Sequence, residues 1–320
     1  MTGGLGSLGS HFVEELLTHG AHVTATTRHA DPRRCAWLPG TGRLRVLELD
    51  LLEGARLRAA LREAAPRVDA VFHCAGMDGN AEFKRRHSAQ ILDVNVRLAA
   101  HILNAARDAE IPTVVMAGSA ETALRPETPA GPFVPGRSAD GYARSKLFTE
   151  FLADLHRTQY GTRVFVPRFT NVYGPRDRFD STARVIPAML TRILAGDAVE
   201  VWGDGSQIRT FIHAADAVRA TLQIAAQDHE HVVTIGTAET ITMTDLARLI
   251  FDLLGAPERI DTVAVDHPQP GGRVLDVTTM NRLIDFTPRP LRDGIAETLR
   301  WYRAQHRAPR TLAPYAIRGT

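Results

Sequence analysis

The sequence has only two lysines, Lys84 and Lys146, so its positive charge comes almost wholly from arginine. Lysines and arginines together number 38 against 36 acidic residues, which gives a net charge of +2. A balance this close to zero gives no argument for binding nucleic acid or an anionic membrane surface. Because lysine is so rare, the position of each of the two lysines is informative.

Cysteine is equally scarce, since Cys35 and Cys74 are the only two and lie far apart. They show neither metal-ligand spacing nor the density of a disulfide framework, and we therefore expect a reduced, cytoplasmic protein. The thirteen histidines are scattered, and His229 and His231 flank Glu230 in a predicted loop, so no metal site is predicted. We find no secretory signal and no apolar run of about 18 residues, and so expect no membrane-spanning segment.

Between residues 21 and 168, short β-branched runs alternate with amphipathic helical patterns. That alternation predicts a parallel sheet built from βαβ units. The predicted strands are Ala21–Thr26, Leu44–Leu49, Ala70–His73, Thr113–Ala117 and Arg163–Pro167. The predicted helices are His11–Thr18, Leu57–Ala64, Ala89–Ala109 and Tyr142–Gln159.

A glycine-rich turn, Thr2-Gly3-Gly4-Leu5-Gly6-Ser7-Leu8-Gly9, opens the chain. The spacing of Gly3, Gly6 and Gly9 lets the backbone approach a pyrophosphate at a helix N-terminus, as in Rossmann-type dinucleotide sites. In that fold the turn follows a buried first strand, usually central in the sheet, and this first strand is apparently missing from the sequence. Either the fold lacks the strand or further residues precede Met1, and we favour the second interpretation.

After Arg168 the alternation gives way to segments rich in Pro, Gly and Asp, and only Val232–Ile235 is predicted as a further strand. Helices are predicted at Thr244–Leu254 and Leu291–His306. We expect a doubly wound dinucleotide-binding domain over residues 1–168, to which 211–236 return. A smaller substrate-binding lobe would comprise 169–210 and 237–303, followed by a tail at 304–320.

The ends of the predicted strands indicate which cofactor is held. NAD needs a carboxylate for its ribose 2′-hydroxyl, whereas this chain has Arg28, which suits the 2′-phosphate of NADP. NADP is therefore the favoured cofactor and NAD the alternative. The predicted cofactor residues are Gly3, Gly6, Leu8, Gly9, Arg28, Asp50, Leu51, Ala75, Gly76, Asn95, Tyr142 and Lys146.

Tyr142 and Lys146 lie four residues apart, which places them on one helix face one turn apart. An ammonium beside a phenol favours the phenolate and so lowers the pKa of tyrosine from about 10. Ser119 follows the predicted strand Thr113–Ala117, at the strand end where ligands gather, and can hydrogen-bond an oxygen that is oxidised or reduced. A solvated helix face and a turn serine are the alternative interpretations.

These residues and three later motifs together resemble the extended short-chain dehydrogenase/reductase family, the NAD-dependent epimerase/dehydratases. The motifs are Pro167-Arg-Phe-Thr-Asn-Val-Tyr-Gly-Pro175, Arg209-Thr-Phe-Ile-His-Ala-Ala-Asp216 and Ile235-Gly-Thr-Ala-Glu239. The pattern is most similar to the GDP-fucose synthase and GDP-mannose 3,5-epimerase branch. The resemblance implies that Ser119, Tyr142 and Lys146 transfer a hydride. It also implies a substrate-binding set of Asn171, Arg184, Val185, Trp202, Arg209 and Arg273.

Two positions depart from that branch. GDP-fucose synthase has a cysteine two residues after the serine and a histidine before the Val-Ile-Pro run, where this chain has Glu121 and Arg184. An arginine cannot donate a proton usefully at neutral pH, which argues against a double epimerase. A glutamate at this position resembles sugar 4,6-dehydratases and UDP-glucuronate decarboxylases, so Glu121 is predicted as an auxiliary acid/base.

The sequence thus predicts a nucleotide-diphospho-sugar oxidoreductase that transfers a hydride at sugar C4, as a 4-ketoreductase or epimerase on a GDP-sugar. One alternative is a 4,6-dehydratase that uses Glu121, and another is a non-catalytic, dinucleotide-sensing binding protein. The expected partner is the nucleotide sugar, with neither nucleic acid nor membrane. A homodimer is expected because Ala89–Ala109 and Tyr142–Gln159 resemble the helices of a two-fold four-helix interface.

Overall fold

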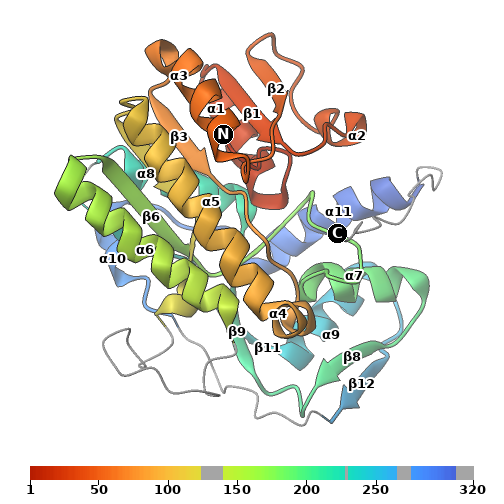
Figure 1. Ribbon diagram of the computed structural model, residues 1–320. Helices are drawn as coiled ribbons and strands as arrows, with labels where there is room; N and C mark the ends of the chain where they lie inside the picture. The colour runs from red at the N-terminus through yellow and green to blue at the C-terminus, as the bar shows by residue number, and fades with distance from the viewer. Residues whose placement is uncertain (124–139, 228–229, 265–274, 308–320) are drawn as a thin grey trace.

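The structure, a computed structural model, describes residues 1–123, 140–227, 230–264 and 275–307. A parallel sheet with helices on both faces forms its larger part (Figure 1). Across this sheet the strands follow the order β2, β1, β3, β4, β6 and β10, and the short β5 also pairs with β6. Their bounds are β1 (Val23–Thr27), β2 (Leu44–Glu48), β3 (Ala70–His73), β4 (Thr113–Met116), β5 (Gly118–Ser119), β6 (Arg163–Phe169) and β10 (Val232–Ile235).

Thr2 lies between β1 and β3, in the place of the central first strand that is missing from the sequence. It forms parallel bridges with Thr26 and His73. The Thr2 N–H donates to the Phe72 carbonyl at 2.8 Å, and the Thr2 carbonyl accepts from the Cys74 N–H at 3.1 Å. The glycine turn therefore leaves the sheet at the carboxyl ends of the two neighbouring strands.

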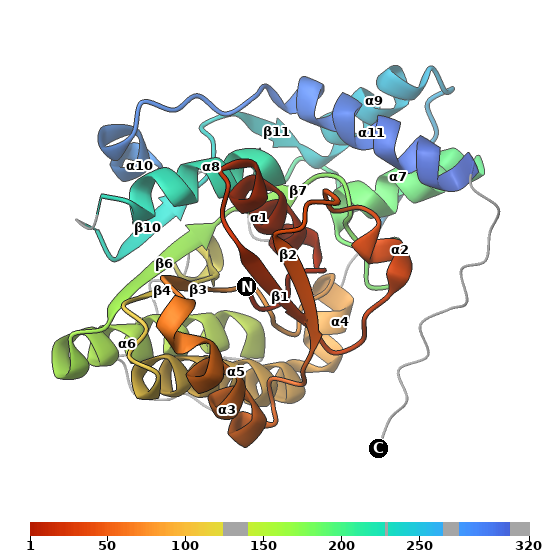
Figure 2. The same ribbon diagram turned by 90° about the horizontal axis from the view of Figure 1, so that it is seen from above.

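Helices cover both faces of the sheet in two layers (Figure 2). Each helix carries apolar side chains at helical spacing, and this apolar face packs on the strands. In α5 the buried residues include Ile91, Leu98 and Ile102. One layer consists of α3 (Gly54–Ala64), α5 (Ser88–Asp108) and α6 (Gly141–Tyr160). The other consists of α1 (Ser7–Thr18), α8 (Ala214–Ala225) and α10 (Thr278–Leu283).

A second apolar core lies beyond β6 and includes the buried Ile186, Leu190 and Ile250. It is built from α7 (Val185–Ala195), α9 (Met243–Leu254) and α11 (Leu291–Arg307) with the parallel pair β8 (Val199–Trp202) and β12 (Ile260–Val263). A further sheet carries the chain between the two cores and consists of β7 (Asn171–Tyr173), β9 (Ile208–His213) and β11 (Thr240–Thr242). Among the described helices, none combines the length and the apolar character that a bilayer crossing requires.

The predicted strands and helices are confirmed with small shifts at their ends. The expectation of loops after Arg168, with Val232–Ile235 as the only further strand, is wrong. The helices α7 and α8 are regular, and β7, β8, β9, β11 and β12 are further strands. Pro187 made α7 hard to recognise, yet it lies in the first turn, where a proline is tolerated because that N–H has no partner within the helix. The sequence also missed the short helices α2 (Pro32–Cys35) and α4 (Ala81–Arg86).

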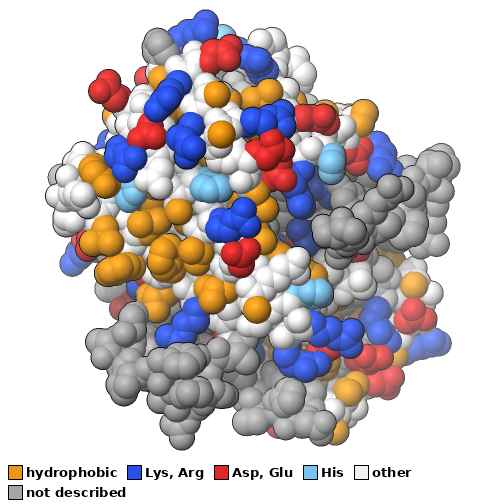
Figure 3. Space-filling model, viewed as in Figure 1, with side chains coloured by type: hydrophobic (Ala, Val, Ile, Leu, Met, Phe, Trp, Pro, Cys, Tyr) orange, Lys and Arg blue, Asp and Glu red, His pale blue; other side chains and the backbone are white. Residues whose placement is uncertain are grey.

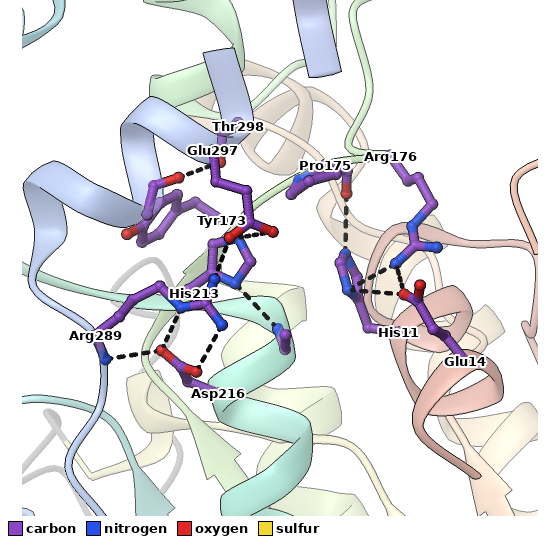
Figure 4. A network of polar contacts seen from close by, with 12 residues as sticks. His11, Glu14, Tyr173, Pro175, Arg176, His213, Asp216, Arg289, Glu297 and Thr298 are labelled. Carbon is purple, nitrogen blue, oxygen red and sulfur yellow. Dashed lines mark hydrogen bonds and ion pairs between the residues drawn. The ribbon is translucent and has the colours of Figure 1, made fainter. Parts of the chain in front are cut away.

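Polar contacts fix α1 to the segment that follows β7 (Figure 4). His11 Nδ1 accepts a hydrogen bond from Arg176 at 2.8 Å, so its proton lies on Nε2, which is 3.1 Å from the Pro175 carbonyl oxygen. Burial and the Arg176 charge hold the pKa of His11 well below its usual range. Arg176 also pairs with Glu14. The helix that carries the glycine turn is thus tied to the chain that enters the second core.

A neighbouring cluster around Arg289 joins α8 to α11 (Figure 4). Its guanidinium donates to the two carboxylate oxygens of Asp216 at 2.9 and 3.0 Å and pairs with Glu297. His213, whose ring lies between these groups, has a pKa lowered to about 3, by burial first and by the Arg289 charge second. These charged groups hold the second core in a fixed position relative to the main sheet.

Candidate active site

The glycine turn packs against the end of β3 so closely that only glycine fits at two of its positions. Gly3 has a φ of +68°, and a Cβ there would lie 2.7 Å from the Ala75 nitrogen. A Cβ on Gly9 would overlap the Gly3 carbonyl oxygen. Gly6, the N-cap of α1, has no side chain to cap the helix. The N–H groups of the first helical turn are therefore left for an anionic ligand, as a dinucleotide pyrophosphate requires.

Two arginines reach the same turn from distant parts of the chain. Arg34 of α2 lies with Nη1 3.4 Å from the Leu5 carbonyl oxygen. Arg184, the N-cap of α7, lies with Nη2 3.5 Å from Ser7 Oγ and 2.8 Å from Asp177. The sequence predicted Arg184 as a substrate residue, and the structure brings it to the glycine turn. The turn, its bare helix end and these cations fit a bound dinucleotide.

The other predicted cofactor residues lie along the carboxyl edge of the sheet. Arg28 is exposed directly after β1, and Leu8 is partly buried in the first turn of α1. After β2, Asp50 accepts a hydrogen bond from the Leu52 N–H at 2.9 Å and Leu51 is buried. Arg28, Asp50 and Leu51 thus follow the carboxyl ends of the two strands β1 and β2.

Asn95, a predicted cofactor residue, binds the loop that follows β3. Its Oδ1 accepts from the Met77 N–H at 2.7 Å, and its Nδ2 donates to the Met77 carbonyl and to Ser145 Oγ at 3.1 and 3.2 Å. A Cβ on Gly76 would lie 3.3 Å from Asn95 Oδ1. The amide thus holds the loop that follows β3 in position against α6.

The structure brings Ser119, Tyr142 and Lys146 together, as the sequence predicted. Ser119 ends β5, and Tyr142 lies in the first turn of α6, which Asp140 caps by accepting from the Ala143 N–H at 3.0 Å. A side-chain hydrogen bond joins Ser119 to Tyr142. The Lys146 Nζ donates to the Ala117 carbonyl at 2.6 Å and lies 5.8 Å from the centroid of the Tyr142 ring.

Lys84 and Asp78 belong to the same cluster, and the sequence did not single them out as site residues. The Lys84 Nζ lies 3.7 Å from the centroid of the Tyr142 ring, 3.1 Å from Glu121 Oε1 and 3.3 Å from Asp78 Oδ1. Glu121 therefore lies beside Tyr142, but its carboxylate is bound by a lysine. The signal that could have found Lys84 is its rarity, because both lysines of the chain contact this tyrosine.

The electrostatics of this cluster favour a protonated tyrosine. Burial raises the pKa of Tyr142, the Asp78 carboxylate adds to this, and Lys84 opposes both. The sequence predicted that Lys146 lowers the pKa of Tyr142, and this is wrong, because the pKa is raised and the lysine that opposes the rise is Lys84. Burial lowers the pKa of Lys146 itself. For Lys84, burial alone would lower the pKa, but Asp78 and Glu121 outweigh it and the pKa is raised. The Tyr142 phenol is thus protonated at neutral pH and lies next to a fixed ammonium.

Of the remaining predicted substrate residues, Asn171 and Arg209 lie on the sheet between the cores, and Trp202 and Val185 lie on elements of the second core. Asn171 Nδ2 donates to the Thr210 carbonyl at 2.8 Å, and Arg209 Nη1 donates to the Ile208 carbonyl at the same distance. Trp202 ends β8 with 41% of its surface exposed, so its ring is open to a stacking partner. Val185 begins α7 and packs on the second core. The predicted Arg273 lies outside the described residues.

A model of the NAD dependent epimerase/dehydratase family matches residues 1–236. The chain belongs to this family. That result confirms the predicted family and shows the chain to be an enzyme. The Rossmann-type parallel-sheet fold is confirmed as well.

Similarity to individual proteins extends over almost the whole chain. A dTDP-4-dehydro-6-deoxy-D-allose reductase of Streptomyces bikiniensis is 44% identical over 95% of this chain and 95% of its own. The GDP-L-fucose synthase of Escherichia coli is 27% identical over 80% of this chain and 86% of its own. Among solved structures, the dTDP-glucose 4,6-dehydratase of Streptomyces venezuelae with NAD bound has a TM-score of 0.82 and 26% identity, covering 95% of this chain and 96% of its own.

Proposed function

We propose that this chain is a 4-ketoreductase of a dTDP-linked 6-deoxy-sugar, with a nicotinamide dinucleotide as hydride donor. The observation that carries the proposal is the 44% identity, over almost the full length of both chains, to a dTDP-4-dehydro-6-deoxy-D-allose reductase. The GDP-sugar favoured by the sequence gives way to a dTDP-sugar, because the GDP-L-fucose synthase is only 27% identical. The cluster of Ser119, Tyr142 and Lys146 provides the groups that such a reduction needs.

When bound, the dinucleotide supplies the hydride that the carbonyl carbon accepts. Tyr142 donates a proton to the oxygen at C4, because its phenol is protonated at neutral pH. The Ser119 hydroxyl, hydrogen-bonded to Tyr142, orients the same oxygen. Lys146 lies one turn along α6 and is held by the Ala117 carbonyl, where it can hydrogen-bond a ribose.

The test is to offer the protein a dTDP-4-keto-6-deoxy-hexose with NADPH or NADH. We expect loss of the reduced-dinucleotide absorbance and a 4-hydroxy product by NMR. The GDP-linked 4-keto sugar serves as the comparison and should react more slowly. Consumption of neither sugar with either dinucleotide would rule out the proposed reaction.

A 4,6-dehydratase is the second candidate, because Glu121 lies beside Tyr142 and the solved dTDP-glucose 4,6-dehydratase shares the fold. A dehydratase restores its dinucleotide within one turnover and so consumes none. Adding dTDP-glucose without reduced dinucleotide and measuring the alkali-absorbing 4-keto product separates the two. Formation of that product would favour the dehydratase.

The cofactor prediction concerns Arg28, which is exposed at the end of β1. We expect the protein to bind NADP more tightly than NAD by about 10- to 100-fold, because the guanidinium makes a charge-assisted contact with the 2′-phosphate. Arg28→Asp should reverse this preference in dinucleotide titrations. Arg45→Asp makes the same change on an exposed arginine near the N-terminal end of β2, away from the carboxyl edge of the sheet. This variant should bind NADP and NAD with the parent affinities. Tighter binding of NAD by the parent protein would exclude NADP as the preferred cofactor.

The assembly prediction concerns an apolar face on α5 and α6, visible in Figure 3 as a gathering of hydrophobic side chains. Its exposed members are Leu92, Phe148, Phe151 and Leu155. We propose that a second copy of the chain covers this face, because large apolar patches on a free surface are unfavourable. Phe151→Asp should then convert a dimer to a monomer near 35.1 kDa in light scattering.

The matched control is Ala59→Asp on the exposed side of α3, which adds the same charge outside the apolar face and should leave the dimer intact. A parent protein that already has the mass of a monomer at micromolar concentration would contradict the predicted assembly.

A further inference from the structure

Lys84 is largely buried and is surrounded by two carboxylates and an aromatic ring. Its ammonium contacts Asp78, Glu121 and the ring of Tyr142, and only 20% of its side chain is exposed. Asp78 comes from the loop after β3 and Glu121 from the 3₁₀ turn Ala120–Thr122 after β5. The lysine therefore joins the loop after β3, this 3₁₀ turn and the first turn of α6, where Tyr142 lies.

The helix that carries Lys84 is itself anchored. Asn80 caps α4 by accepting from the Phe83 N–H at 2.9 Å. The same side chain donates to the Ser181 carbonyl at 2.8 Å, and the Asn80 N–H donates to the Thr182 carbonyl at 3.0 Å. These contacts hold α4 against the chain that leads to α7. The backbone of Lys84 is therefore fixed in position.

Building on the proposed reduction, we propose that Lys84 is a positioning residue that holds Glu121 in an ion pair and so keeps this carboxylate from removing a proton next to the 4-keto group. The ion pair engages Glu121 Oε1 at 3.1 Å and fixes the direction of the carboxylate, so this oxygen is not free to turn towards a C–H bond of the sugar. Asp78 forms a second ion pair with the same Lys84 ammonium, at 3.3 Å.

The chemistry that Lys84 suppresses is proton exchange at C3 or C5. A 4-keto group acidifies the hydrogens on both carbons, and a free Glu121 could accept one of them. The electron pair of the broken C–H bond then moves to the C4 oxygen, beside Tyr142 and Ser119. Return of a proton from the carboxyl group to the same carbon restores the ketone, so the cycle needs no oxidant, reductant or dinucleotide.

The experiment measures deuterium uptake by dTDP-4-keto-6-deoxyglucose in D₂O without reduced dinucleotide, by mass spectrometry. We expect Lys84→Met, which keeps the aliphatic volume and removes the charge, to exchange about 10- to 100-fold faster than the parent protein, within the range of general-base effects. Lys84→Arg restores a cation and should exchange as slowly as the parent. The double variant Lys84→Met with Glu121→Gln should also be slow, because the base is gone.

Exchange by Lys84→Met at the parent rate, or fast exchange that persists in the double variant, would overturn the role of Lys84. Failure of the proposed function looks different, since no variant would then reduce or exchange the sugar. In that case a double-mutant cycle of unfolding free energies for Lys84→Met and Glu121→Gln still tests whether the two side chains interact, because this measurement needs no sugar. Additive effects in the cycle would show that Lys84 does not hold Glu121.

Discussion

Replacement of Tyr142 with phenylalanine is expected to lower kcat for reduction of the 4-keto sugar by about 10²–10⁴, the usual contribution of a positioned general acid. The variant keeps the aromatic ring that Lys84 contacts and removes only the hydroxyl that hydrogen-bonds to Ser119. Dinucleotide affinity should change little, because the variant keeps the aromatic ring of Tyr142 and leaves the glycine turn untouched. Steady-state kinetics and a dinucleotide titration on the same preparation measure both quantities.

Tyr160→Phe is the matched control, since Tyr160 is the last residue of the same helix and is 45% exposed. Its hydroxyl lies outside the cluster around Lys84, so reduction should proceed at the parent rate. If Tyr142→Phe reduced the sugar as fast as the parent, another group would have to protonate the C4 oxygen.

Replacement of Gly9 with alanine is expected to abolish measurable dinucleotide binding and to lower the free energy of unfolding by about 1–3 kcal/mol or more, as overpacking in a tight site does. The added Cβ would overlap the Gly3 carbonyl oxygen, so either α1 or the turn must move. Both movements displace the helix N–H groups from the pyrophosphate position. Thermal unfolding and a dinucleotide titration measure the two effects.

Gly40→Ala provides the comparison, because a Cβ at Gly40 has no atom within 4 Å among its described neighbours. That variant should melt and bind dinucleotide like the parent. A Gly9→Ala protein with the parent melting temperature and affinity would show that the turn tolerates the extra carbon.

The sequence determined the elements of the main sheet and the residues of the candidate hydride-transfer set. Hydrophobic period and β-branched runs are local properties, so strands such as Ala70–His73 and helices such as α5 could be predicted without knowledge of their neighbours. The spacing of Tyr142 and Lys146 is likewise local, because one helical turn brings them to the same face. Where Pro187 obscured the periodicity of α7, the same reasoning failed.

Contacts between distant segments were decided by the tertiary structure alone. Lys84, Asp78 and Glu121 come from a short helix, a loop and a 3₁₀ turn, and none of these has a period that predicts its neighbours. The parallel sheet brings the carboxyl ends of β3 and β5 to one edge, and that edge brings the three side chains within ion-pair distance. Sequence composition marked Lys84 as rare, but only the packing of α4 over Tyr142 made it part of the site.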